Sequence, residues 1–169
     1  MELYIADIKD CDILNGSGLR VSVWFQGCEH HCEGCQNPQT WNPDGSSVKL
    51  DERLDEIRGY LSSPYIKGIT LTGGDPFYMP RIEAMNEFVE LIKREFPGKD
   101  IWAYSGYTYE DLLKHPVAKK ILDKIDVLCD GKFEIAKRDV DIHWVGSTNQ
   151  SVIDVKNSLE QGEIVLLNV

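Results

Sequence analysis

The sequence predicts an α/β fold with a largely parallel sheet. Short apolar runs, rich in β-branched and aromatic residues, alternate with longer stretches in which apolar residues recur at helical spacing. Helices between consecutive strands allow those strands to run parallel. The length of 169 residues suits a single domain, so we expect residues 1–169 to form one unit.

The strands are predicted from the apolar runs. The first long run, LRVSVWF, follows the turn-forming residues NGSG. Later runs such as GITLT, IWAYS and IDVLC have the same character and end at Gly, Ser or Asp. We expect strands at 19–25, 68–72, 101–105, 125–129, 142–146, 151–155 and 163–169.

Helices are predicted between these strands. Pro80 suits a helix entry, and Thr108 with Asp111 three residues later resembles a capping box. The pair His115-Pro116 interrupts one helical stretch. The expected helices cover 51–61, 81–96, 108–113 and 117–124.

Four polar loops follow the predicted parallel strands. In such sheets, sites form beyond the carboxyl ends of the strands, so these loops should meet at one edge. They contain a cysteine-rich segment at 26–41, GGDP at 73–76, SGYT at 105–108 and CDGKFE at 129–134. This edge is where we expect function.

Composition excludes several function classes. The net charge is −10 and the basic clusters are short, which does not suit a nucleic-acid binder. No apolar run approaches the about 20 residues of a membrane helix. The first residues, MELYIADIKD, place acids where a secretory signal has bases. We therefore expect a cytoplasmic protein with reduced thiols and no membrane partner.

Three of the five cysteines are concentrated in one loop. Cys28, Cys32 and Cys35 have the spacing C-x3-C-x2-C. Three thiolates can hold a [4Fe-4S] cluster and leave one iron without a protein ligand. Zinc with His30 or His31 as fourth ligand is an alternative, and a redox C-x-x-C is another.

The remaining cysteines lack this context. Cys129 lies in an apolar run and is expected to be a small buried residue, and Cys11 has no spaced partner. Both are left out of the predicted site. Arg20 and Trp41 flank the cysteine segment, and packing is the expected role of Trp41.

The motifs around the cysteines resemble those of a known family. The C-x3-C-x2-C spacing after a buried strand, followed by GGDP after the next, is similar to radical S-adenosylmethionine (SAM) enzymes. More narrowly, the chain resembles the anaerobic ribonucleoside-triphosphate reductase activating proteins. The motifs concerned are NGSGLR, GCEHHCEGCQNPQTW, TLTGGDPF, SGYTYEDL, DGKFE and GSTNQ.

The resemblance implies a radical mechanism. Cys28, Cys32 and Cys35 would ligate a [4Fe-4S] cluster, and SAM would bind the open iron through its amino and carboxylate groups. One electron from the cluster would cleave SAM to methionine and a 5′-deoxyadenosyl radical. That radical would abstract hydrogen from a glycine of anaerobic ribonucleotide reductase. A flavodoxin or similar low-potential donor is the implied source of electrons.

The resemblance also implies SAM contacts. Gly73 and Gly74 would meet the methionine end, with a tight turn as their structural role. Asp75 would hold the SAM ammonium or cap the next helix. Ser105 would reach the ribose or carboxylate.

The adenine contact is expected from the backbone around Gly34, Cys35 and Gln36. Many superfamily members have an aromatic residue where this chain has Gly34, whereas the narrower family shares the glycine. Gln36 occupies a position where tyrosine is expected in many relatives. Asp130 and Lys132 are expected at the end of a strand, where they bind cofactor or partner or pair with each other. The GSTNQ loop at 146–150 is expected to order the rim of the site or to meet the partner.

The small size suggests how the substrate is recognised. With 169 residues, little chain is left for a lid, so a protein substrate would close the site. We expect an incomplete (βα) barrel of the radical SAM type with one side uncovered. Alternatives are another glycyl-radical activase, a 7-carboxy-7-deazaguanine synthase, or a zinc-stabilised binding module.

Overall fold

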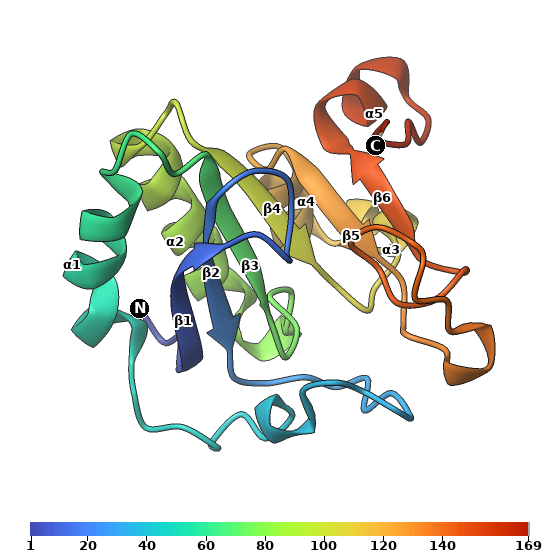
Figure 1. The fold of residues 1–169 in the computed structure, drawn as a ribbon, viewed down its shortest axis with the longest axis horizontal. Helices are drawn as coiled ribbons and strands as arrows, with labels where there is room; N and C mark the ends of the chain where they lie inside the picture. Colours follow the sequence, from blue (N-terminus) through green and yellow to red (C-terminus); the bar gives the residue numbers. More distant parts are fainter. Residues whose placement is uncertain (169) are drawn as a thin grey trace.

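The computed structural model describes residues 1–168, and within them six strands form one sheet in chain order (Figure 1). Strands β2 to β5 pair in parallel, whereas β1 and β6 run antiparallel at the two edges. The α/β class and the largely parallel sheet are therefore confirmed, with antiparallel edges as an addition. The strands are β1 (Ile5–Asp12), β2 (Arg20–Phe25), β3 (Gly68–Gly73), β4 (Asp100–Tyr104), β5 (Val127–Asp130) and β6 (Ser151–Asp154).

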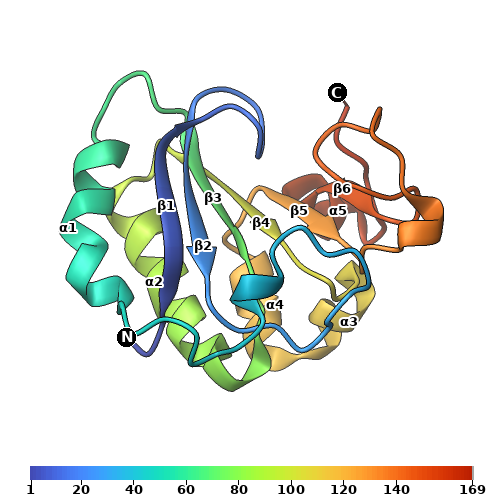
Figure 2. The ribbon, with the colours of Figure 1, turned by 60° about the horizontal axis from the view of Figure 1, so that its bottom comes forward.

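Helices cover one face of the sheet. Those from α1 to α4 lie behind it in Figure 1, and Figure 2 shows the strand ends and the loops that follow them. His115 explains the break between α3 and α4, because it ends the first and its Nδ1 accepts from Ala118 N–H at the start of the second. The helices are α1 (Leu50–Leu61), α2 (Ile82–Glu95), α3 (Tyr109–Lys114), α4 (Pro116–Leu122) and α5 (Val155–Gln161).

The two faces of the sheet differ in chemistry because successive strand residues point to opposite sides. The helix-covered face forms the main apolar core with Val21, Val23, Phe25, Ile69, Leu71, Ile101 and Ala103. The opposite face receives the residues between them: Ser22, Trp24, Thr70, Thr72, Trp102 and Tyr104. The second face is thus polar and aromatic, which suits a binding surface.

Two predicted strands are wrong. Residues 142–146 form bends without a strand, because Trp144 has φ +73° and its ring packs against Trp102 instead of alternating in a sheet. Residues 163–168 contribute only the single bridge between Leu166 and Ile153, and Val169 lies outside the described residues.

Two elements were not predicted. Strand β1 was missed because it is an edge strand whose residues are mostly exposed and polar. Helix α5 begins at Val155, which was assigned to a strand. Asp154 caps that helix by accepting from the Asn157 N–H at 3.1 Å.

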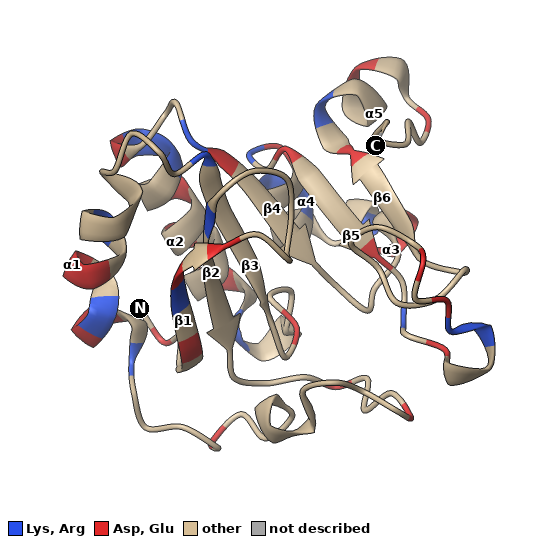
Figure 3. Cartoon of the chain, in the orientation of Figure 1, with Lys and Arg blue, Asp and Glu red and all other residues tan. Residues whose placement is uncertain are grey.

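Charged side chains of both signs alternate over the helices (Figure 3). The segment from 26 to 48 differs, because it carries Glu29, Glu33 and Asp44 but no Lys or Arg.

In residues 1–168 no helix combines the length and apolar character needed to cross a bilayer.

An ion pair between the buried Arg20 and the partly exposed Asp100 joins the amino ends of β2 and β4. Arg20 is fully buried, and its guanidinium lies 2.5 Å from Asp100 Oδ1 and donates to Thr70 Oγ1 at 2.8 Å. Although Arg20 is near the cysteines in sequence, it lies at the opposite end of β2, so it does not flank them in space. Its role is structural.

Replacing Arg20 by alanine should remove its ion pair with Asp100 and its buried hydrogen bond to Thr70, and lower the free energy of unfolding by about 1–3 kcal/mol. Urea unfolding of Arg20→Ala checks this. Arg58→Ala is the matched control, because Arg58 pairs with Glu95 at the surface and should change little. Equal midpoints for Arg20→Ala and wild type would contradict this role.

Candidate active site

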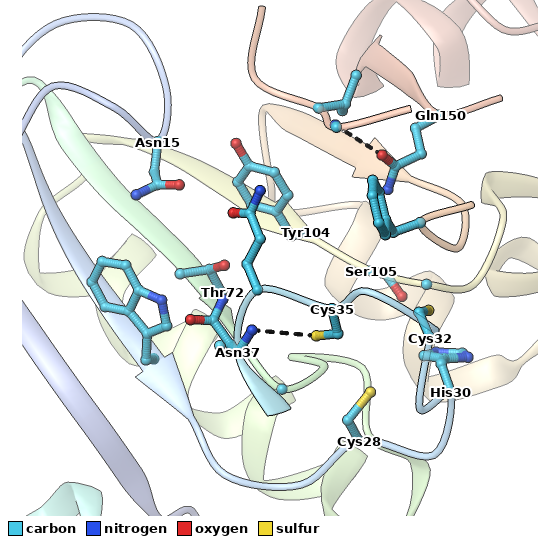
Figure 4. Close-up of a pocket in the computed structure, with 18 of the residues that line it drawn as sticks. Asn15, Cys28, His30, Cys32, Cys35, Asn37, Thr72, Tyr104, Ser105 and Gln150 are labelled. Carbon is cyan, nitrogen blue, oxygen red and sulfur yellow. Dashed lines mark hydrogen bonds between the residues drawn. The ribbon is translucent and has the colours of Figure 1, made fainter. Parts of the chain in front are cut away.

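A pocket of about 540 Å³ lies at the carboxyl ends of the parallel strands and extends over the polar face of the sheet. All four predicted loops contribute to its wall, so their convergence is confirmed. Figure 4 shows the cysteine loop along one side, with Tyr104 and Gln150 across from it. From the sheet itself, Trp24, Thr72 and Tyr104 line the pocket.

The cysteine loop is anchored at both ends. It leaves β2 at Gly27, whose N–H donates to Thr40 O at 2.7 Å, and Cys28 N–H donates to Trp41 O at 3.1 Å. These two bonds bring the end of the segment back to its beginning. Between them, Cys35 N–H donates to Cys32 O at 3.1 Å. This hydrogen bond closes a turn between the last two cysteines of the loop.

The three thiols of the loop line the pocket as free, half-buried side chains. Burial raises the pKa of Cys28 to about 11 and also raises the pKa of Cys32. A backbone N–H, that of Asn37, donates to Cys35 Sγ at 3.4 Å. Since metals bind thiolates, metal binding here would release protons.

The donor set fits an iron–sulfur cluster better than zinc. The two histidines proposed as a fourth zinc ligand have other partners: His30 Nε2 lies 2.6 Å from Asp75 Oδ2, and His31 stacks on Trp41 at 4.6 Å. Three soft thiol donors that line a pocket of about 540 Å³ suit an iron–sulfur cluster.

The turn after β3 requires glycine twice. Gly73 has φ +105°, and a Cβ there would overlap the backbone of Phe25. At Gly74 a Cβ would overlap the backbone of Gly27. Two hydrogen bonds of 2.8 Å seal this contact, from Gly74 N–H to Phe25 O and from Asp75 N–H to Gly27 O. The turn therefore supports the base of the cysteine loop.

Asp75 is buried, and both of its carboxylate oxygens accept hydrogen bonds from the protein. Its Oδ1 accepts from Phe77 N–H at 2.8 Å, within the turn that precedes α2. Its Oδ2 accepts from Ser105 Oγ and Gly106 N–H, both at 3.0 Å, and faces His30.

Most of the predicted site residues share this pocket. Gly34 and Asp75 do not line it. Gly34, with φ +75°, is exposed and lies against Ile135 and Phe133, whereas Asp75 is buried. The predicted residues that line the pocket are Cys28, Cys32, Cys35, Gln36, Gly73, Gly74 and Ser105.

Trp144 was missed by the sequence analysis. It lines the pocket, its φ of +73° is unusual for a bulky residue, and its buried Nε1–H has no acceptor among residues 1–168. Tyr104 OH donates to its carbonyl at 2.7 Å, which holds this backbone in place. The apolar run IHWVG indicated a strand, and only the adjoining GSTNQ motif pointed towards the site.

The GSTNQ loop is tied to the loop after β5. Gln150 Oε1 accepts from the N–H groups of Gly146 and Ser147 at 2.9 and 3.0 Å, and its Nε2 donates to Gly131 O at 2.9 Å. Asn149 donates to Lys132 O at 2.8 Å. The motif thus builds the pocket wall that carries Trp144.

Asp130 lies beneath this wall rather than in it. Its Oδ2 accepts from Tyr109 N–H at 2.8 Å, and desolvation raises its pKa. Its observed role is to join β5 to the start of α3.

Comparison with known proteins adds an independent finding. Residues 14–153 match the family described as a 4Fe-4S single cluster domain. The chain is 41% identical over 143 residues to the anaerobic ribonucleoside-triphosphate reductase-activating protein of Enterobacteria phage T4, covering 85% of this chain and 88% of that protein.

Bacterial proteins of the same name are similar. The Pasteurella multocida protein is 40% identical over 144 residues, covering 83% of this chain and 90% of its own length. The Escherichia coli K12 protein is 38% identical over 143 residues, covering 83% and 92%. The chain therefore belongs to the family of anaerobic ribonucleoside-triphosphate reductase-activating proteins.

Proposed function

We propose that this protein activates anaerobic ribonucleotide reductase by installing a glycyl radical on it, with a [4Fe-4S] cluster at Cys28, Cys32 and Cys35 and with SAM as cosubstrate. The observation that carries the proposal is one pocket that joins three thiols to a glycine turn and a polar sheet face. Family membership supports the target, since the relatives are named for activating this reductase.

Cys28, Cys32 and Cys35 would hold the cluster, and the bound groups would supply reductive cleavage of SAM and hydrogen abstraction from a glycine. The chain positions and shields the reactants. Gly73 and Gly74 line the pocket where the methionine end of SAM would bind. Cys35 and Gln36 offer backbone towards adenine, with Gly34 supporting them, and Ser105 lies on the same wall.

The architecture also fits a protein substrate. Helices α1 to α4 cover one face of the sheet (Figure 2). Trp24, Thr72 and Tyr104, on the other face, line the pocket. This arrangement supports an incomplete (βα) barrel of the radical SAM type, formed by the whole chain as one domain. A loop of the reductase catalytic subunit would complete the uncovered side and exclude water. A low-potential donor such as flavodoxin would supply the electron.

The direct test is formation of the glycyl radical. Anaerobic protein, SAM, a chemical reductant and the reductase are mixed and examined by electron paramagnetic resonance. We expect a glycyl signal that requires all four components. A cluster that cleaves SAM without radical on the reductase would instead favour another small radical SAM enzyme, and a colourless zinc protein would favour a binding module.

The three thiols are expected to be individually essential. Cys28→Ala, Cys32→Ala and Cys35→Ala should each lose cluster iron after anaerobic reconstitution and abolish SAM cleavage, because a three-thiolate site cannot spare a ligand. Cys11→Ala is the control, since Cys11 is exposed on β1 away from the pocket wall. Wild-type turnover in any of the three would refute the assignment.

The Trp144 ring lines the pocket, so we propose that it contacts bound SAM. Trp144→Ala removes this ring, so the Kd for SAM should rise by about 2- to 12-fold, the equivalent of one aromatic contact. Equilibrium dialysis with labelled SAM measures the change. Thermal unfolding shows whether the fold is kept, and an unchanged Kd in a folded variant would exclude this contact.

A further inference from the structure

We propose that His30 is a positioning residue, whose ring fixes the cysteine loop to the ends of β3 and β4 before any iron binds. The inference rests on the proposed function for the identity of the group that the loop holds. The geometry that carries it is present in the protein alone: a nearly closed site for one imidazole, formed by residues of two other loops.

His30 is unusual for a side chain on a long surface loop. It lies between Cys28 and Cys32, yet its side chain is only 5% exposed. The adjacent residues Glu29 and His31 are exposed. A polar ring is therefore buried between two exposed neighbours, and a buried polar group requires a partner.

That partner is Asp75, whose side chain is 1% exposed and whose Oδ2 lies 2.6 Å from His30 Nε2. Ser105 Oγ and Gly106 N–H donate to the same oxygen, so one carboxylate joins the cysteine loop to the GGDP and SGYT loops. A hydrogen bond to a charged buried group is among the stronger ones in proteins.

The rest of the enclosure is steric. The Tyr107 ring meets the His30 ring edge-on, with centroids 4.5 Å apart and planes at 73°. A Cβ on Gly106 would overlap the imidazole, so only glycine allows this approach. We refer to Asp75, Ser105, Gly106 and Tyr107 as the His30 socket.

The socket places the neighbouring cysteine ligand. His30 is two residues from Cys28 and two from Cys32 in the sequence. A ring held at His30 therefore restricts the path of the chain at both thiols. Hydrogen bonds to cluster sulfurs influence both assembly and reduction potential, so a loosened loop should alter each.

This inference gives the SGYT motif and Asp75 a different role from contact with SAM. The Ser105 hydroxyl donates to Asp75 and accepts from Tyr107 N–H at 3.1 Å, which completes the turn of the socket. The carboxylate of Asp75 already accepts hydrogen bonds from Phe77, Ser105 and Gly106. We therefore assign Asp75 and Ser105 to holding the His30 ring, which in turn holds the cysteine loop.

The test compares two adjacent histidines in the full-length protein. In cluster-free protein, amide hydrogen exchange over residues 28–35 should become roughly 10-fold faster or more in His30→Ala, because a bond to a charged buried group is lost. His31→Ala should exchange like wild type, since His31 only stacks on Trp41. His30→Gln, which keeps a donor at a similar reach, should restore part of the protection.

A second readout uses the cluster. After anaerobic reconstitution, His30→Ala and Asp75→Asn should hold less iron per chain and give an altered electron paramagnetic resonance signal when reduced, whereas His31→Ala should match wild type. If His30→Ala does not fold, His30→Gln and Asp75→Asn, each compared with His31→Ala, provide the same test.

The outcomes separate this inference from the proposed function. Faster exchange in His30→Ala in a protein that binds no cluster would sustain the positioning role and reject the proposed function. A normal wild-type cluster with His30→Ala indistinguishable from His31→Ala, in exchange, iron content and signal, would overturn the positioning role and leave the function standing.

Discussion

The end of β2 and the turn after β3 meet backbone to backbone, and the site depends on that contact. Gly73 and Gly74 have no space for a Cβ, because Phe25 and Gly27 occupy it. The contact brings the start of the cysteine loop against the GGDP turn and places Asp75 beneath the loop. A larger residue at either glycine would separate the strand ends and move the thiols away from the pocket. Glycine here is required by packing, before any ligand binds.

The second organising feature is the division between the two faces of the sheet. Apolar side chains from β2, β3 and β4 pack under the helices and form the core. The alternate residues, among them Trp24, Thr72 and Tyr104, face the pocket. One alternation therefore both stabilises the fold and builds the binding surface. The GSTNQ loop closes one side of that surface through Gln150, and the remaining opening suits a substrate that is itself a protein.

The sequence predicts the parts of this structure that depend on local patterns. The parallel strands, the helices and the convergence of loops follow from periodicity and from the order of elements, and the cysteine spacing indicates the centre. Contacts between residues that are far apart in the sequence are harder to predict. Strand β1 has too little buried surface to show a pattern, and the apolar run around Trp144 packs as a loop because of the Trp102 ring. His30 and its partner Asp75 are 45 positions apart in the sequence, so the spacing of motifs does not reveal their contact.

The central claim is that three thiols hold a cluster whose remaining iron binds SAM. Electron–nuclear double resonance on the reduced protein, with SAM carrying ¹⁵N in its amino group, tests this directly. The account predicts a nitrogen hyperfine coupling to the cluster that appears only when labelled SAM is present and is absent in Cys35→Ala. A reduced cluster signal with no coupling to SAM nitrogen, at a concentration where SAM is bound, would contradict it.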